Sequence, residues 1–200
     1  MLIAFEGLDQ SGKETQSRTL RSRLESSGYR VHALSFPEYD TPIGREIRQA
    51  LDGARDFTPD VMQLLYVANR LEFKARLTAW LDAGDVVVCD RYCASTIAYG
   101  EAQALDPAWL REIQRYLPPA HVTVLLDIAP ETAARRKATG RDRYERDLEL
   151  LARVRESYRR QAAAAGWCVI DAEGQKAEVA AAVVAAVLPR LSPPSTPARS

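Results

Sequence analysis

The fold is decided by the opening stretch Met1-Leu-Ile-Ala-Phe-Glu-Gly7-Leu-Asp-Gln-Ser-Gly12-Lys13-Glu14-Thr15. Its apolar run from Leu2 to Phe5 predicts a short buried strand, and the residues after Lys13 have a helical pattern. A strand, a Gly-x4-Gly-Lys loop and a helix in this order are typical of a phosphate-binding P-loop. A tight turn with an exposed lysine is the alternative explanation of the same motif.

The loop has the residue types that phosphate binding needs. Glycines let the backbone curl so that successive N–H groups point at phosphate oxygens, and the helix N-terminus adds partial positive charge. Lys13 is expected to reach the outer phosphates. The Ser or Thr that usually follows this lysine and binds Mg²⁺ is replaced by Glu14, and Thr15 comes one place late. The residues expected to surround the phosphates are Gly7, Leu8, Asp9, Gln10, Ser11, Gly12, Lys13, Glu14 and Thr15.

Length and composition limit the class of protein. The 200 residues are enough for one domain with a sizeable core, and 27 basic residues balance 27 acidic ones. Neither a nucleic acid nor a membrane is therefore expected as a partner. No stretch approaches the roughly 20 apolar residues of a membrane span, and the N-terminus lacks a signal-peptide pattern. We expect a cytoplasmic protein whose three cysteines are reduced and packed.

Apolar segments alternate with helical segments along the chain. The predicted strands are 2–5, 30–36, 85–90, 121–127 and 167–170. The third is apolar on both faces, which is typical of a central strand in a parallel sheet. We predict one three-layer α/β/α P-loop domain over residues 1–189, with a five-stranded parallel sheet and right-handed crossovers. Residues 190–200, rich in Pro and Ser, are predicted to be a disordered tail.

A long helix is predicted to begin after Thr58 with Pro59 and to end near Ala83, because a capping hydroxyl, a proline and an acid mark its start. Tyr66 and Arg70 lie one turn apart on a stripe of their own. They are candidates for one wall of a pocket, although an ordinary, partly exposed face explains the same spacing. The expected buried stripe is Val61, Leu64, Leu65, Ala68, Leu71 and Ala75.

Polar residues follow the third predicted strand. Asp90 and Arg91 lie at its carboxyl end, where open α/β sheets bind ligands. The helix predicted over 94–103 can turn Ser95, Thr96 and Tyr99 toward the same crevice. His32 and His121 fall inside or at the start of strands, far from this edge. We therefore assign both histidines structural roles.

The stretch 135–147 is strongly basic. It holds six Lys or Arg side chains against three acidic ones, and Gly140 offers a hinge. A run of this kind is often a solvated surface. In a P-loop protein it also serves as a mobile lid whose arginines close on phosphates.

The absence of certain motifs limits the reactions that this protein can be expected to catalyse. No Asn-Lys-x-Asp motif specifies guanine, and one compact domain leaves no room for a motor or a transporter ATPase. A phosphate loop, a basic lid and a second pocket together indicate a nucleotide or nucleoside kinase.

Five separate motifs, in order over residues 1 to about 171, resemble those of bacterial thymidylate kinases. They are Phe5-Glu6-Gly7-Leu8-Asp9-x-Ser11-Gly12-Lys13, Phe36-Pro37-x-Tyr39, Leu64-Leu65-Tyr66-x-Ala68-Asn69-Arg70, Asp90-Arg91-Tyr92-x-x-Ser95 and Asp142-Arg143-Tyr144-Glu145. The resemblance implies transfer of the γ-phosphate of ATP to dTMP, with Mg²⁺ as cofactor and a homodimer as the usual assembly.

The resemblance also implies a role for each site residue. ATP phosphates lie on residues 7–15, and Asp9 with Glu145 lies near the metal. The implied catalytic residues are Asp9, Lys13, Arg91, Arg141 and Arg143. The implied dTMP-binding residues are Phe36, Pro37, Arg45, Tyr66, Arg70, Arg91, Ser95, Thr96 and Tyr99.

The loop has Gln10 and Ser11 where an arginine would supply charge to the transferred phosphoryl group. That charge is therefore expected from the lid, at Arg141 or Arg143. Another nucleoside monophosphate kinase, or a deoxynucleoside kinase, is the alternative enzyme. A catalytically inactive nucleotide-binding module, marked by Glu14, is the alternative of a different class.

Overall fold

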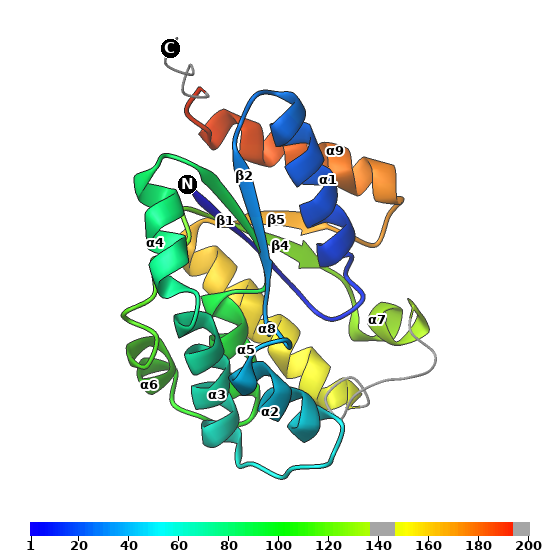
Figure 1. Cartoon of the computed structure of the whole chain (residues 1–200). Coiled ribbons are helices and arrows are strands. Elements are labelled where there is room, and N and C mark those ends of the chain that lie inside the picture. The colour runs from blue at the N-terminus through cyan, green and yellow to red at the C-terminus, as the bar shows by residue number, and fades with distance from the viewer. Residues whose placement is uncertain (137–146, 194–200) are drawn as a thin grey trace.

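The computed structural model describes residues 1–136 and 147–193, and in these ranges it is a parallel sheet between two layers of helices (Figure 1). The strand order is β2-β3-β1-β4-β5, and all four neighbouring pairs are parallel. The predicted three-layer fold is confirmed. The strands are β1 Leu2–Glu6, β2 Val31–Ser35, β3 Val86–Asp90, β4 Val122–Asp127 and β5 Cys168–Asp171.

Helices follow the strands and cover both faces of the sheet (Figure 1). None of the helices within the two described ranges is long and apolar enough to cross a bilayer. The bounds are α1 Lys13–Ser26, α2 Pro42–Leu51, α3 Pro59–Leu71, α4 Lys74–Asp82, α5 Cys93–Ala102, α6 Pro107–Glu112, α7 Pro130–Arg136, α8 Leu148–Ala165 and α9 Lys176–Val187, followed by a 3₁₀ turn at Leu188–Arg190.

The central strand β1 is buried on both faces, as its uninterrupted apolar run predicts. Ile3 and Phe5 lie in one hydrophobic cluster with Leu20 of α1. Leu2 and Ala4 lie in another, with Leu77 of α4. Because the strand is enclosed, the loop that follows it emerges from a rigid base.

The long helix predicted from 59 to 83 is two helices, α3 and α4, with a break at Glu72 and Phe73. The Phe73 ring is buried in a T-shaped contact with Phe36, whose ring centroid is 5.6 Å away. Tertiary packing of this ring outweighs the helical propensity of the segment. The prediction of a single helix was wrong for that reason.

The predicted buried stripe of α3 was also wrong. Leu64 and Leu71 are 46% and 37% exposed, whereas Gln63, Asn69 and Arg70 are buried. The side-chain amide of Asn69 has hydrogen-bond partners in the loop after β2. Its Oδ1 accepts from the Glu38 N–H at 2.8 Å, and its Nδ2 donates to the Glu38 carbonyl at 3.1 Å.

The two histidines have the structural roles that their positions predicted. Nδ1 of His121 accepts a hydrogen bond from the Leu2 N–H at 3.0 Å. His32 stacks on Trp80 with ring centroids 4.1 Å apart, and its Nε2 lies 2.8 Å from an Asp85 oxygen. Both lie away from the residues of the phosphate loop.

The packed part of the chain extends slightly past residue 189, where the domain was expected to end. Leu191 packs against the main hydrophobic cluster. The Tyr29 hydroxyl donates to the Ser192 carbonyl at 3.0 Å. The apolar side chain at 191 anchors this described end of the chain, which a count of prolines does not reveal. The rest of the predicted tail, residues 194–200, lies outside the described residues.

We expect Gly44→Ala to destabilise the fold. A Cβ at Gly44 of α2 would overlap the Glu38 carbonyl, and backbone cannot move aside as a flexible side chain does. Overpacking of this kind costs about 1–3 kcal/mol, measurable as a lower free energy of unfolding in urea. The exposed neighbour is the control, since Arg45→Ala should change this free energy by less than about 0.5 kcal/mol. Equal effects of the two substitutions would contradict this account.

Candidate functional site

The loop between β1 and α1 has the geometry of a phosphate cradle. Gly7 and Gly12 have φ angles of 137° and 94°, which L side chains rarely adopt. A Cβ on Gly7 would also overlap the Leu126 carbonyl oxygen of β4. The cradle opens into a cavity of about 700 Å³, here called the larger cavity, which is lined on this side by Asp9, Gln10, Ser11, Gly12, Lys13, Glu14 and Thr15.

Lys13 is buried at the bottom of this loop. Its side chain is 6% exposed, and its ammonium donates to the Leu8 carbonyl at 2.8 Å and lies 4.0 Å from the Asp9 carboxylate. Burial lowers its pKa, and the nearby Arg91 lowers the pKa further. Two cations held close together in a cavity favour a bound anion such as phosphate.

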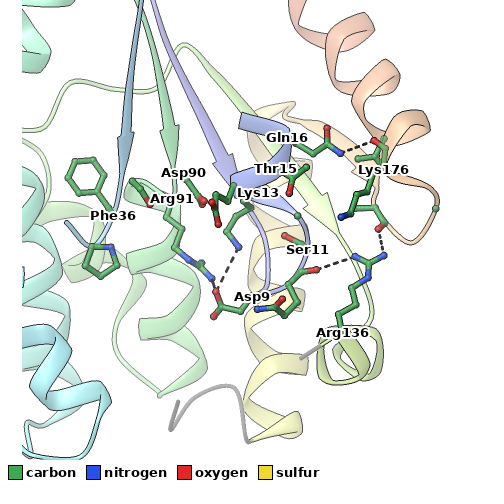
Figure 2. Close-up of a pocket in the computed structure, with 18 of the residues that line it drawn as sticks. Asp9, Ser11, Lys13, Thr15, Gln16, Phe36, Asp90, Arg91, Arg136 and Lys176 are labelled. Atoms are coloured by element: carbon green, nitrogen blue, oxygen red, sulfur yellow. Dashed lines mark hydrogen bonds and ion pairs between the residues drawn. The ribbon is translucent and has the colours of Figure 1, made fainter. Parts of the chain in front are cut away.

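Arg91, at the carboxyl end of β3, points its guanidinium at the loop (Figure 2). Its φ of 63° is unusual for a residue other than glycine and is typical of functional sites. Its Nη2 donates to Asp9 Oδ1 at 2.7 Å, and its Nη1 donates to Ser95 and Tyr158 hydroxyls, both at 3.2 Å. Burial opposes its charge, but Asp9 raises the pKa of Arg91 well above its usual value.

A buried carboxylate binds two hydroxyl groups that accept hydrogen bonds from Arg91. Glu6 is fully buried, and its Oε2 accepts from the Ser95 hydroxyl at 2.6 Å and from the Tyr158 hydroxyl at 3.2 Å. Its Oε1 accepts from the Tyr92 N–H at 2.9 Å. Sequence reasoning gave neither Glu6 nor Tyr158 a role, because each looks like a strand or helix position of the core.

A second, smaller cavity of about 90 Å³ lies beside the first. Here Arg70 donates through Nη1 to Thr96 Oγ1 at 2.8 Å and to the Tyr66 carbonyl at 3.3 Å. The predicted pocket wall on α3 is therefore real. Its lining residues are Asp9, Phe36, Pro37, Tyr39, Leu51, Gln63, Tyr66, Arg70, Arg91, Ser95, Thr96 and Tyr99.

The two cavities are continuous at their shared wall. The residues that line both are Asp9, Phe36, Pro37, Tyr39 and Arg91. In Figure 2 Asp9, Lys13 and Arg91 point toward one another at this junction. Two anionic groups, one from each cavity, can therefore meet beside the same pair of cations.

Not every predicted residue reaches the site. Arg45 is exposed, lines neither cavity and donates from Nη1 to the Asp40 carbonyl at 2.8 Å. Glu14, by contrast, does reach the larger cavity, where its side chain is exposed. Arg141, Arg143 and Glu145, which carry the expected lid and metal roles, lie outside the described residues.

Tyr39 lines both cavities, although sequence reasoning used it only as part of a motif. The Arg48 guanidinium covers its ring at 3.7 Å from the centroid. A cation over an aromatic face restricts the ring's orientation. The Phe-Pro-x-Tyr spacing was the available signal for this residue.

The far wall of the larger cavity was also missed. It is built from Arg136, from Ala172 and Gly174 in the loop between β5 and α9, and from Lys176, the first residue of α9. Figure 2 shows Arg136 and Lys176 on this side of the cavity. Arg136 joins this loop to the phosphate loop, donating to the Gln10 carbonyl at 3.1 Å and the Ala172 carbonyl at 2.9 Å. No motif marks the β5–α9 loop, so sequence alone gave no signal for it.

The larger cavity contains oxygen donors of the kind that Mg²⁺ prefers. Asp9 and Asp90 line it beside Lys13, and burial raises the pKa of Asp90. Within the described ranges, no three His, Cys, Asp or Glu side chains are grouped to hold a metal by themselves. These residues fit a magnesium ion that takes its remaining ligands from phosphate and water, as Mg²⁺ commonly does at phosphate sites.

Comparison with known proteins agrees with this geometry. The thymidylate kinase family model matches residues 5–183. A thymidylate kinase from a Synechococcus strain is 38% identical over 200 aligned positions, covering 96% of each chain, and a probable one from Pyrobaculum calidifontis is 38% identical over 191, covering 94% of this chain and 95% of its own. The solved thymidylate kinase of Candida albicans has a TM-score of 0.78 at 26% identity, covering 94% of this chain and 91% of that one.

Relatives come from eukaryotes as well as archaea and bacteria, among them a thymidylate kinase of Arabidopsis thaliana at 34% identity over 89% of this chain. The narrower resemblance to bacterial enzymes is therefore not specifically supported. Family model, relatives and fold all agree on the broader group. The chain belongs to the thymidylate kinase family.

Proposed function

We propose that this protein transfers the γ-phosphate of ATP to dTMP, giving ADP and dTDP. The observation that carries the proposal is the junction of two cavities at Asp9 and Arg91, with Lys13 beside it. Phosphoryl transfer needs little covalent help from the protein. It needs two phosphates held in line, with their charge neutralised.

The larger cavity suits the donor nucleotide. The loop N–H groups and Lys13 would hold the phosphates of ATP. The wall formed by Arg136 and the loop 172–176 lies on the side to which the rest of ATP would extend. The cavity of about 700 Å³ is of the size that nucleotide-sized ligands occupy.

The smaller cavity suits the acceptor. Tyr66 offers a ring for stacking on thymine, and Arg70 a donor for a base carbonyl. Thr96 and Tyr99 would lie along the base and sugar, with Tyr99 excluding a 2′-hydroxyl. Phe36, Pro37 and Ser95 complete the acceptor set.

Arg91 would bind the acceptor phosphate. We assign the second contact with this phosphate to Tyr39 in place of Arg45, because Tyr39 lines both cavities and Arg45 lines neither. We further propose that Arg141 and Arg143 supply the remaining positive charge at the transferred group. An arginine in that position is worth about 10³-fold or more in rate.

Magnesium is proposed as the cofactor, held by Asp9 with Asp90 or Glu145 and by the phosphates. When bound, it would neutralise charge on the phosphate oxygens. Asp9 also pairs with Arg91 at 2.7 Å, so the same carboxylate orients the arginine that receives dTMP. The protein's own contribution is to position these charged groups before the substrates arrive.

We also propose that the chain works as a homodimer in the cytoplasm. The exposed leucines of α3, Leu64 and Leu71, lie on one apolar stripe with Ala68. A stripe of this kind, unlike scattered apolar residues, is typical of a contact surface. The three free thiols fit a reducing compartment.

Leu64→Glu should convert the dimer to a monomer, because it places a charge within an apolar contact. Analytical ultracentrifugation measures the outcome. The matched control is Tyr116→Glu, which alters another exposed apolar side chain, 60% exposed and on a different part of the chain. A monomeric wild type, or a dimer unaffected by Leu64→Glu, would contradict the assignment of this surface.

The acceptor is tested by a coupled ATP assay with dTMP, dUMP, UMP, AMP and thymidine. We expect dTMP to have the highest kcat/KM. Lys13→Ala should lower kcat by about 10²–10³-fold, because it removes charge stabilisation at the transferred group. Lys74→Ala, at a lysine that lies over Tyr116, is the control. A better acceptor than dTMP would favour the alternative kinases, and an inactive wild type would favour the non-catalytic module.

Tyr158→Phe should raise the KM for dTMP by about three- to tenfold and leave the KM for ATP nearly unchanged. The hydroxyl accepts from Arg91 and donates to Glu6, so its loss loosens the arginine that holds the acceptor. Tyr29→Phe removes a hydroxyl that bonds only near the end of the chain and serves as the control. An equal change in both KM values would argue against a selective role in orienting Arg91.

A further inference from the structure

Buried polar atoms without partners gather at the two cavities. Six such side-chain atoms occur among the residues that the structure describes. Five of the six belong to cavity-lining residues, and the exception is Gln114. Leaving a buried polar atom unpaired is costly, so these five atoms indicate where ligand atoms complete the hydrogen bonding.

Gln63 is the clearest case. Its side chain is 1% exposed, it lines the smaller cavity, and both its amide oxygen and its amide nitrogen lack a partner. The sequence motifs gave this residue no role. If it only packed α3 into the fold, an apolar side chain of similar size would do so without the cost of two unpaired atoms.

The helix places Gln63 opposite Arg70 across Tyr66. All three residues belong to α3 and line the smaller cavity. Arg70 comes seven positions after Gln63, which turns the two side chains to nearly the same side, about 10.5 Å apart along the axis. Tyr66 lies between them, so a ring stacked on Tyr66 has a polar side chain at each end.

A carboxamide presents one donor and one acceptor side by side. The pyrimidine ring of thymine presents the complementary pair, with N3–H as donor next to the C2 carbonyl as acceptor. Arg70, whose Nε also lacks a partner, would donate a hydrogen bond to the C4 carbonyl. Cytosine offers an unprotonated N3 and an amino group instead, so it mismatches both side chains.

We propose that Gln63 is a further substrate-binding residue that reads the N3–H and O2 edge of the base. The Oε1 atom accepts from N3–H, and Nε2 donates to O2. The assignment rests on the proposed function, because it requires a thymine nucleotide in the smaller cavity. It makes Gln63 a determinant of specificity for thymine and uracil over cytosine.

Calorimetric titration of the full-length protein with dTMP and with N3-methyl-dTMP tests the proposal. The methyl group removes the N3–H donor, so wild type should bind the analogue at least about tenfold more weakly. Gln63→Leu should weaken dTMP binding by about tenfold and reduce the preference for dTMP over the analogue to less than about threefold. Gln63→Met, which is closer in shape, should do the same.

Two controls separate this role from a general disturbance. Gln114→Leu alters a buried glutamine that also has an unpaired oxygen but lines neither cavity, so it should keep the wild-type preference. ATP affinity and the thermal midpoint of both Gln63 variants, without dTMP, should match or exceed those of wild type, because no unpaired amide is left. A wild-type preference retained in the Gln63 variants would overturn the proposal.

The same experiments distinguish an error in the proposed function from an error in the role of Gln63. If wild type neither binds nor phosphorylates dTMP, the acceptor is wrong. If wild type phosphorylates dTMP but the Gln63 variants discriminate normally between dTMP and its N3-methyl analogue, only the role of Gln63 is wrong.

Discussion

The ion pair between Arg91 and Asp9, 2.7 Å apart, is the interaction on which the site depends. It joins the end of β3 to the phosphate loop and lies where the two cavities meet. Burying a guanidinium is costly unless it is paired and fully hydrogen-bonded. Asp9 in front and the hydroxyls of Ser95 and Tyr158 behind meet that requirement. The charge is therefore fixed in place before any substrate binds.

The support reaches through the core to Glu6, which accepts hydrogen bonds from elements far apart in the sequence. Its three donors come from the segment after β3, from α5 and from α8. A carboxylate at the end of the central strand thus ties two helices to the arginine. Networks of this kind are stabilising only when every member is satisfied, which makes the position of Arg91 unusually well defined.

The sequence predicted those features that depend on local pattern. The phosphate loop, the five strands and the polar edge at Asp90 and Arg91 follow from glycine spacing and hydrophobic periodicity. The break before α4 did not, because it depends on the distant contact of Phe73 with Phe36. The exposed face of α3 was missed because periodicity shows that a helix has an apolar stripe and not what covers it.

The residues of the site also fall into those that the sequence predicted and those that it did not. The site residues of the four motifs that the structure describes were brought together, whereas Arg136 and the β5–α9 loop joined the larger cavity through chain topology alone. Asn69 shows what such long-range contacts do, since its amide clasps the backbone of Glu38 on both sides. This clasp couples the helix that carries Tyr66 to the loop that carries Tyr39. Tyr39 lines both cavities and Tyr66 lines the smaller one, so a shift of either element changes the shape of both cavities together.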